Sequence, residues 1–395
     1  MFNHDSFSAF SDCNSDRSAE FPTPSSENSD ELIRQLVLKL VSCSIEEQKQ
    51  ATMEIRLLAK NKQENRPKIA KAGAIQPLIS LLPSSDLQLQ EYVVTAILNL
   101  SLCDENKELI ASHGAVKALV APLERGTATA KENAACALVR LSHNREEEKV
   151  AIGRAGAIPH LVKLLEGGGL RGKKDAATAL YALCSAKENK VRAVRAGIMR
   201  GLVELMADLG SSMVDKAVYV VSVVVGVAEA RAALVEEGGI PVLVEIVEVG
   251  TQRQKDIAAG VLLQICEESV VYRTMVSREG AIPPLVALSQ SHSNRAKQKV
   301  TLLPLLSSLM PRDLSFFCSC TLPTGSETNT TSTTTKIPQW RCSHLGNATN
   351  PTLKLQKLVY VCDLNYASLV LCFDSLLPIS LELWSNILHF LFLAV

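Results

Sequence analysis

The sequence predicts an all-α fold, a right-handed superhelical solenoid of about six to seven helical repeats. A copy of one phrase recurs along the chain, for example GAIPHLVKLL from Gly156 and GAIPPLVAL from Gly280. The phrases begin at glycines spaced by 41, 42, 41, 41 and 42 residues: Gly73, Gly114, Gly156, Gly197, Gly238 and Gly280. A period of about 40 residues is typical of stacked helices that bury their apolar faces against neighbouring repeats.

Each repeat is predicted to contain a helix that ends at the glycine, a second helix over the phrase after it, and a last helix rich in small residues. Apolar residues at helical spacing mark the core-facing stripes of the last two helices. Examples are Ile158, Leu161, Val162 and Leu165 in a second helix, and Ala134, Ala137, Leu138 and Leu141 in a last helix. Because the chain turns sharply at the glycine, we expect a positive φ there.

The chain divides into three predicted regions. Residues 1–29 are acidic and rich in serine, lack a periodic apolar stripe, and are expected to be disordered. Residues 30–310 carry the repeats, and Asp30 is the expected N-cap of the first helix. Residues 311–395 lose the repeat pattern and become low-complexity and then apolar, which indicates either a tail with its own role or a different exon or retained intron.

The C-terminal region contains two candidate sites that the residue pattern does not favour. Residues 375–395 approach the length of a membrane span, but Glu382 and Pro378 interrupt the apolar run, so a tail anchor is disfavoured. A zinc site is disfavoured because the CxC and CxH spacings fall short of the usual ligand gaps. Its ligands would be Cys318, Cys320, Cys342 and His344.

The repeat phrases resemble the armadillo repeat, in which GAIPxLVxLL is followed by NAAxALxxLS and then by EN before the next glycine. The best copies run from Gly156 to Leu165 and from Asn133 to Ser142, while EN recurs at Asn65, Asn106 and Asn189. Over residues 29–310 the chain is similar to the armadillo region of plant U-box ubiquitin ligases and their U-box-less relatives. The resemblance implies a scaffold associated with ubiquitin transfer, whereas fold alone does not specify function.

Composition excludes several functional classes. The chain has 41 basic and 41 acidic residues, so its formal net charge of zero argues against a nucleic-acid binder. Cysteines such as Cys136, Cys184 and Cys266 lie in apolar helical phrases, which favours buried free thiols in a reducing compartment. With no secretory signal, we expect a cytoplasmic protein that also enters the nucleus. Histidines occur singly, without a paired nucleophile, so we expect neither enzymatic activity nor a cofactor.

A helical solenoid offers a concave groove for an extended peptide or a partner's helix, lined by the last helix of each repeat. Alignment of the repeats places two rows of side chains in this predicted groove. The candidate partner-binding residues in these rows are Thr95, Asn99, Arg140, Tyr219 and Gln264. Nuclear import adaptors of the armadillo class carry Trp and Asn at such positions, and both tryptophans of this chain, Trp340 and Trp384, lie in the tail. A nuclear transport adaptor is therefore the weaker alternative.

A row of lysines completes the candidate surface. It consists of Lys131, Lys173, Lys255 and Lys297, with Val214 as the gap. Because cations at a helix N-terminus oppose the macrodipole, we infer either an edge of the groove that binds acidic segments of a partner or a solvated stripe that keeps the turns soluble.

The predicted function is a non-enzymatic scaffold for protein–protein interaction. The 29 residues ahead of the repeats are too few for a U-box, so a direct ligase role is not expected. A substrate-receptor subunit that acts in trans through a separate U-box protein is the other alternative.

Overall fold

A computed structural model describes residues 26–142, 145–267, 269–290, 359–364 and 367–372. The chain divides into two units, residues 1–309 and 310–395, which are described separately. In the second unit, strands β1 (Val359–Leu364) and β2 (Ala367–Cys372) form an antiparallel hairpin in which Val359 pairs with Cys372. The sequence analysis did not predict this hairpin. Lys297, the tryptophans, the zinc candidates and the 375–395 segment lie outside the described residues.

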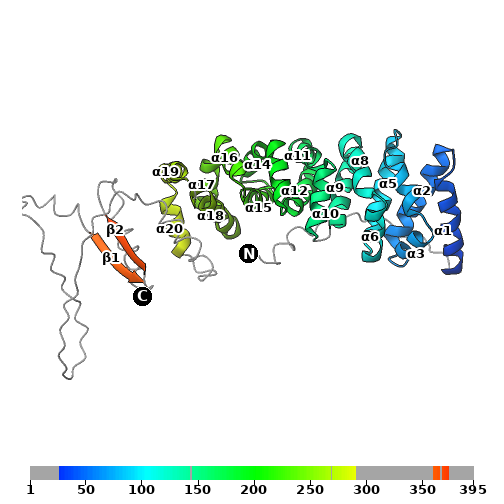
Figure 1. The fold of residues 1–395 in the computed structure, drawn as a ribbon, viewed down its shortest axis with the longest axis horizontal. Coiled ribbons are helices and arrows are strands. Elements are labelled where there is room, and N and C mark those ends of the chain that lie inside the picture. Colours follow the sequence, from blue (N-terminus) through cyan, green and yellow to red (C-terminus); the bar gives the residue numbers. More distant parts are fainter. Residues whose placement is uncertain (1–25, 143–144, 268, 291–358, 365–366, 373–395) are drawn as a thin grey trace, which may run out of the picture. The chain divides into compact units, whose positions relative to one another are not determined.

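The described part of the first unit is helical, and its helices follow one another in chain order (Figure 1). They are α1 Ser26–Leu40, α2 Ile45–Asn61, α3 Asn65–Lys71, α4 Ile75–Leu81, α5 Leu87–Leu100, α6 Asp104–Ser112, α7 Ala115–Ala118, α8 Val120–Arg125, α9 Ala128–Ser142, α10 Glu146–Arg154, α11 Ala157–Gly167, α12 Leu170–Leu183, α13 Lys187–Arg195, α14 Ile198–Ala207, α15 Val214–Val224, α16 Ala228–Glu236, α17 Gly239–Val249, α18 Gln252–Glu267, α19 Val270–Arg278 and α20 Ile282–Gln290.

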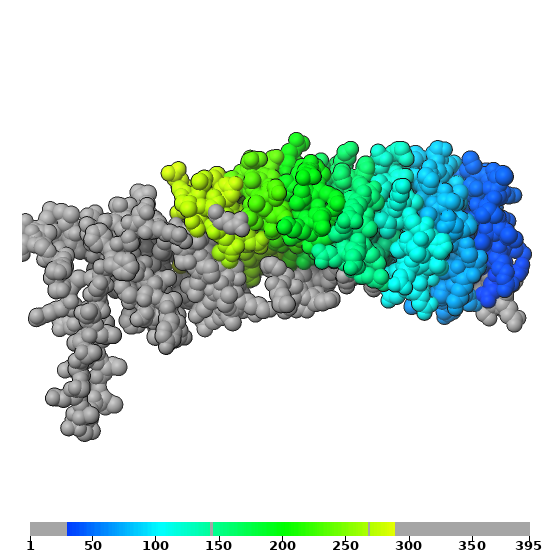
Figure 2. Space-filling view, in the orientation of Figure 1, coloured from blue at the N-terminus to red at the C-terminus, as the bar shows by residue number. Residues whose placement is uncertain are grey.

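The helices repeat in threes, as the sequence predicts. We call them the first helix (α3, α6, α10, α13, α16, α19), the second helix (α4, α7 with α8, α11, α14, α17, α20) and the third helix (α2, α5, α9, α12, α15, α18). Third helices pack on one another in sequence, and each also packs on the second helix of its own repeat. In the space-filling view successive repeats form a continuous surface, coloured from blue to yellow (Figure 2). The predicted all-α solenoid is confirmed.

Each predicted corner glycine adopts the left-handed conformation. The φ angles lie between +75° and +91°, and within the described residues these six are the glycines with positive φ. At the first corner the amide of Ala74 donates to the carbonyl of Ile69 at 3.3 Å, which satisfies a C-terminal carbonyl of α3. A Cβ atom at any of the six would meet no neighbouring atom within 4 Å. The glycine is required by the backbone conformation, because packing leaves room for a side chain.

Buried asparagines join the repeats at the start of the first helices. Asn106 Nδ2 donates to the carbonyl of Leu100 at 3.1 Å and to that of Arg66, in the preceding first helix, at 3.0 Å. Asn189 Nδ2 makes the equivalent bonds to Leu183 at 3.0 Å and Lys149 at 2.7 Å. One amide therefore holds the end of a third helix and two first helices together, which gives the EN motif a structural role.

Two helix boundaries differ from the prediction. Helix α1 begins at Ser26, so Asp30 lies inside the helix, and the predicted N-cap is wrong. The Asp30 carboxylate instead accepts a hydrogen bond from Lys68 Nζ at 2.7 Å, in α3. The second helix of one repeat is divided into α7 and α8 around Leu119. Pro122 explains the break, because proline has no amide hydrogen to donate to the carbonyl of Ala118.

Cys136, Cys184 and Cys266 are buried in the helices as reduced cysteines, as predicted. Burial raises the pKa of both Cys184 and Cys266 to about 12. Since the thiolate is the nucleophile, these two side chains are unreactive at neutral pH. Cys43, after α1, is exposed.

We expect Gly156→Val to lower the free energy of unfolding by roughly 1 kcal/mol or more, because a β-branched residue at this positive φ is strained. Thermal unfolding followed by circular dichroism measures the loss. Gly167→Ala is the control, since Gly167 has an ordinary φ and open space around it, so the melting temperature should not fall. Equal melting temperatures for Gly156→Val and the parent would contradict this account.

We expect a thiol reagent at pH 8 to modify Cys43 in the folded protein but neither Cys184 nor Cys266. A pKa of about 12 leaves almost no thiolate at pH 8 in the last two. Peptide mass spectrometry after alkylation reads each site separately, and unfolding in guanidinium should make all three react. Modification of Cys184 at the rate of Cys43 under native conditions would refute the buried state.

Candidate partner-binding surface

The third helices provide the candidate surface because their side chains meet across the repeats. We call the half-buried and exposed side chains of α2, α5, α9, α12, α15 and α18 the third-helix row. Several of its members, among them Asn99, Arg171 and Tyr219, are held by hydrogen bonds, ion pairs and ring contacts between neighbouring helices, so their positions are fixed before any partner binds. Preorganised side chains lower the entropic cost of binding.

The structure places the predicted groove residues on these helices. Thr95 and Asn99 lie half-buried in α5, Arg140 in α9, Tyr219 in α15 and Gln264 in α18. Asn99 Nδ2 donates to the carbonyl of Arg56 in α2 at 3.1 Å, so this side chain joins two repeats.

A polar chain crosses the middle of the third-helix row. Asn133 Nδ2 donates to Thr95 Oγ1 at 2.9 Å, and Arg171 Nη2 donates to Asn133 Oδ1 at 3.1 Å. Arg171 Nε also lies 3.4 Å from Glu132 and 3.6 Å from Asp175. Burial raises the pKa of Glu132, while the charge of Arg171 opposes that shift. Arg171 thus bridges α9 and α12 through one guanidinium.

Two tyrosine–arginine pairs lie on either side of this polar chain along the sequence. The Arg253 guanidinium lies 4.8 Å from the centroid of the Tyr219 ring, and its Nε donates to the Tyr219 hydroxyl. Tyr181 meets the Tyr219 ring edge-on at 6.0 Å. At the other end, Arg56 lies 4.9 Å from the centroid of Tyr92. Aromatic and arginine side chains of this kind dominate the binding energy of many protein interfaces.

The described members of the lysine row occupy equivalent positions in α9, α12 and α18, as the alignment predicts. The amides of Lys131, Lys173 and Lys255 each donate at 2.9 Å to the carbonyl four residues earlier, in the first turn. Lys255 Nζ, however, donates to the carbonyl of Glu248 at 2.8 Å, near the end of α17. At the equivalent position of α5, Gln90 Nε2 donates to the carbonyl of Leu82 at 2.9 Å.

These contacts change the physical argument for the lysine row. At Lys255 and Gln90 the side chain satisfies a carbonyl at the C-terminal end of the preceding second helix, where a positive charge is favourable. The sequence shows only that each lysine lies at the N-terminus of its own helix. Within the described residues, neither Lys131 nor Lys173 forms an ion pair, so a role for these two in partner binding stays a prediction.

The described residues contain no group of three or more His, Cys, Asp or Glu side chains that could hold a metal ion. Burial lowers the pKa of His160, so its imidazole is neutral at pH 7.

None of the described helices has the length and apolar character needed to cross a membrane.

Sequence reasoning found Arg140 but missed Arg56, Arg171 and Arg253. Arg171 and Arg253 occupy one register of the third helices, two repeats apart, at the position of Gln88 in α5. This register lies two residues before that of the lysine row, so the alignment of repeats contains the signal. Arg56 falls outside that register, and only the structure brings it to Tyr92.

Comparison with known proteins agrees with this architecture. The model of the plant U-box protein ARM repeat region matches residues 31–324. U-box domain-containing protein 1 of Medicago truncatula is 40% identical over 272 residues, which cover 68% of this chain and 39% of the relative. U-box domain-containing protein 3 of Arabidopsis thaliana is 49% identical over 241 residues, or 61% of this chain and 32% of the relative. The chain therefore spans less than half the length of these relatives.

A solved structure shares the fold. A computationally designed armadillo repeat protein for modular peptide recognition is 25% identical with a TM-score of 0.53, covering 59% of this chain and 99% of the designed one. The armadillo repeat is a non-catalytic scaffold fold that binds protein partners. The glycine corners, the three-helix repeats and the extent of the family match lead to one conclusion: the chain belongs to the family of plant U-box protein armadillo (ARM) repeat regions.

Proposed function

We propose that this chain is a non-enzymatic scaffold that binds a peptide or helix of a protein partner along the third-helix row. The observation that carries the proposal is the preorganised set of arginine and tyrosine side chains, Arg253 with Tyr219 and Arg171 with Asn133. Such side chains are large and rigid, and their hydrogen bonds fix their orientation.

The family supports a link to ubiquitin transfer. The relatives carry U-box names, and one with 52% identity over 85 residues is named E3 ubiquitin-protein ligase SPL11, from Oryza sativa subsp. japonica. The chain itself matches the model of the plant U-box protein ARM repeat region. We therefore propose that it presents a partner to the ubiquitin machinery, in the cytoplasm and the nucleus, as a receptor subunit that acts in trans.

The charge pattern of the row bears on the partner's chemistry. Arg171 pairs with both Glu132 and Asp175, so its charge is compensated within the row and this part suits a polar segment. The Arg56 guanidinium forms no hydrogen bond or ion pair among the described residues, and it stacks over the Tyr92 ring. A carboxylate of the partner would complete this site.

We expect Tyr219→Ala with Arg253→Ala to reduce capture of the specific partner by about tenfold or more, since interface anchors of this type are worth about 2 kcal/mol or more. The full-length chain is used as bait in an extract of plant cells, and recovered proteins are quantified by mass spectrometry. Proteins of the ubiquitin pathway should be among those that the double variant loses.

Lys187→Ala with Glu229→Ala is the matched control for this experiment. Both side chains are exposed on first helices, away from the third-helix row, so the capture should be unchanged. Equal recovery of every protein by the Tyr219→Ala, Arg253→Ala double variant and by the parent would contradict binding along the row. Loss of the same proteins in the control variant would place the binding surface on the first helices.

We expect charge reversal of Lys131 and Lys173 to weaken capture of a partner with acidic segments, and to do so more at low salt than at high salt. Lys255→Glu serves as a comparison, because its ammonium group is engaged by the Glu248 carbonyl and its loss should lower stability first. Measurement of binding at two ionic strengths, together with melting temperatures, separates the two effects. Unchanged capture at low salt would leave the lysines as a solvated stripe.

A further inference from the structure

Two arginines from different repeats flank the end of α5. Arg66 lies in the first turn of α3, and Arg140 lies in the last turn of α9. Helices α3 and α9 both pack on α5 and on α6, so the turn from α5 to α6, which contains Cys103, lies between them. Both arginine side chains are half-buried there.

The charge of one arginine acts on the other. Burial lowers the pKa of Arg66, and the nearby positive charge of Arg140 lowers it further, whereas Cys103 opposes the shift. No carboxylate is among the groups that shift this pKa. Within the described residues, neither guanidinium forms an ion pair. Two cations held near each other without an anion repel, so the charge of this pair is uncompensated.

Most hydrogen-bond donors of the two side chains are not used by the protein. Arg66 Nε donates to the carbonyl of Ala59 at 2.9 Å, near the end of α2. This bond leaves the N–H groups of both terminal nitrogens without a partner among the described residues. Arg140 donates no side-chain hydrogen bond to that part of the chain. Because the bond to Ala59 orients the Arg66 guanidinium, binding a ligand there restricts the side chain less.

A cation recurs at the position of Arg66, but a pair of arginines does not. The residue is basic in each described first helix, as Arg66, Lys107, Lys149, Lys190, Arg231 and Arg273. Arg231 and Arg273 donate to carbonyls near the end of the preceding third helix, as Arg66 does, so this position has a general capping role. The position of Arg140 holds no other cation, and its equivalents are Leu58, Asn99, Ala182, Val223 and Gln264. Capping therefore does not explain Arg140.

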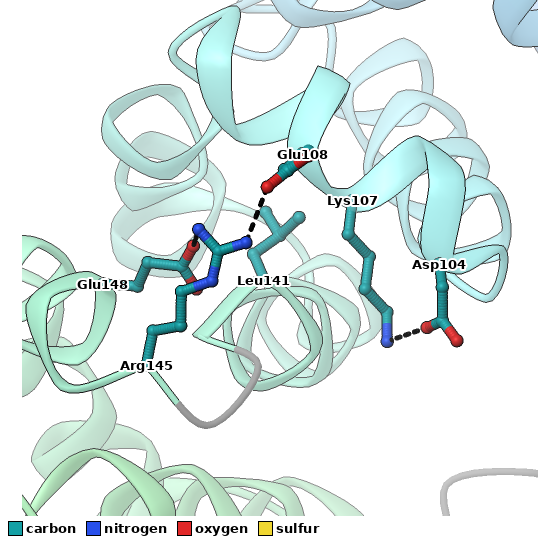
Figure 3. A pocket seen from close by; sticks show the side chains of 6 residues that line it. All are labelled: Asp104, Lys107, Glu108, Leu141, Arg145 and Glu148. Atoms are coloured by element: carbon teal, nitrogen blue, oxygen red, sulfur yellow. Dashed lines mark hydrogen bonds and ion pairs between the residues drawn. The ribbon is translucent and has the colours of Figure 1, made fainter.

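The space between α6 and α10 shows how a compensated group of charges differs (Figure 3). Both cations there have carboxylate partners: Lys107 Nζ lies 2.6 Å from Asp104 Oδ1, and Arg145 Nη2 lies 2.6 Å from Glu108 Oε1. A partner's anion would have to displace these carboxylates, which binding to Arg66 and Arg140 does not require. A pocket of about 230 Å³ at this place is lined by Asp104, Lys107, Glu108, Leu141, Arg145 and Glu148.

The arginine pair is continuous with the third-helix row. Arg140 is a member of the row, and Asn99 of α5 joins the row to α2 through the carbonyl of Arg56 at 3.1 Å. The Arg56 guanidinium, stacked over Tyr92, has a buried Nε atom without a hydrogen-bond partner among the described residues. A segment bound along the row at Asn99 therefore passes the arginine pair.

The chemistry of the pair fits a dianion. A carboxylate carries a single negative charge and compensates one guanidinium, whereas a phosphorylated side chain carries a charge of about −2 at neutral pH. The oxygens of a phosphoryl group also accept paired hydrogen bonds in the geometry that the planar arginine fork presents.

We propose that Arg66 and Arg140 bind a phosphorylated side chain of the partner segment that lies along the third-helix row. The inference rests on the proposed function, because the row supplies the other contacts to that segment. Phosphorylation of the partner then strengthens its capture, since an unmodified hydroxyl leaves both guanidinium groups uncompensated.

Pools of random-sequence peptides with one fixed central residue, which is phosphoserine, serine or glutamate, test the site. The pools are passed over the immobilised full-length chain, and the retained peptide is quantified by mass spectrometry. The parent should retain the phosphoserine pool about tenfold more than the serine pool, because charge-assisted hydrogen bonds from arginine to phosphate are strong. Retention of the glutamate pool should fall between the two.

Arg140→Gln should remove most of the preference for phosphoserine, and Arg66→Gln should do the same. If Arg66→Gln also lowers the melting temperature through its lost bond to Ala59, Arg140→Gln decides the question, since Arg140 makes no such bond. Arg145→Gln is the matched control. It removes the same charge where carboxylates already compensate it, so the preference should persist.

Equal retention of the phosphoserine and serine pools by the parent overturns the phosphate site. An unchanged preference in Arg140→Gln, or an equal loss in Arg145→Gln, also overturns it. Displacement of the phosphoserine pool by inorganic phosphate at the peptide concentration does so too, by showing a site for a free anion. A failure of the proposed function is distinct, because it shows as unchanged capture by the Tyr219→Ala, Arg253→Ala double variant.

Discussion

The left-handed corner between the first and second helices is the constraint on which the rest of the solenoid depends. Six glycines supply it, and each reverses the chain at the same point of its repeat. Because the corner fixes the angle between two helices, it also fixes where the third helix lies and which of its residues face the next repeat. The Asn and Arg side chains at the starts of the first helices then join units whose geometry is already the same. The same backbone conformation in each repeat thus gives the third helices a regular spacing along the surface.

Sequence reasoning succeeded where the repeats constrain one another. The glycine period gave the number of helices per repeat and the positive φ, because only glycine adopts that conformation without strain. The same register located Thr95, Asn99, Arg140, Tyr219 and Gln264 on the third helices. Prediction from the sequence failed where a side chain has several potential hydrogen-bond partners. Aspartate is a common N-cap residue, but the Asp30 carboxylate accepts a hydrogen bond from Lys68, 38 residues later in the chain. No local sequence pattern predicts such a contact.

The lysine row shows the same limit in another form. Periodicity shows that a position recurs, but it does not show where a flexible side chain points. Lys255 turns back to a carbonyl of α17, and Gln90 satisfies the corresponding carbonyl of Leu82 with a neutral amide. Two chemically different residues therefore share one structural role. Repetition in a solenoid is evidence for function only after the shared packing and capping roles have been removed.

The hydrogen bonds between first and third helices allow this distinction to be made at the junctions of the repeats. Asparagine and arginine both donate to the end of a third helix, and where Ala230 and Tyr272 occupy the asparagine position, the next residue, Arg231 or Arg273, makes the contact. Glu148 stands at the asparagine position of α10 and does not make this bond, because its carboxylate is an acceptor and the asparagine amide is a donor. The surrounding backbone keeps the geometry of the other repeats. A solenoid tolerates such a local loss, since each repeat contacts only its neighbours and the other junctions retain their own bonds. The loss of one such bond therefore leaves the repeat geometry of the rest of the stack unchanged.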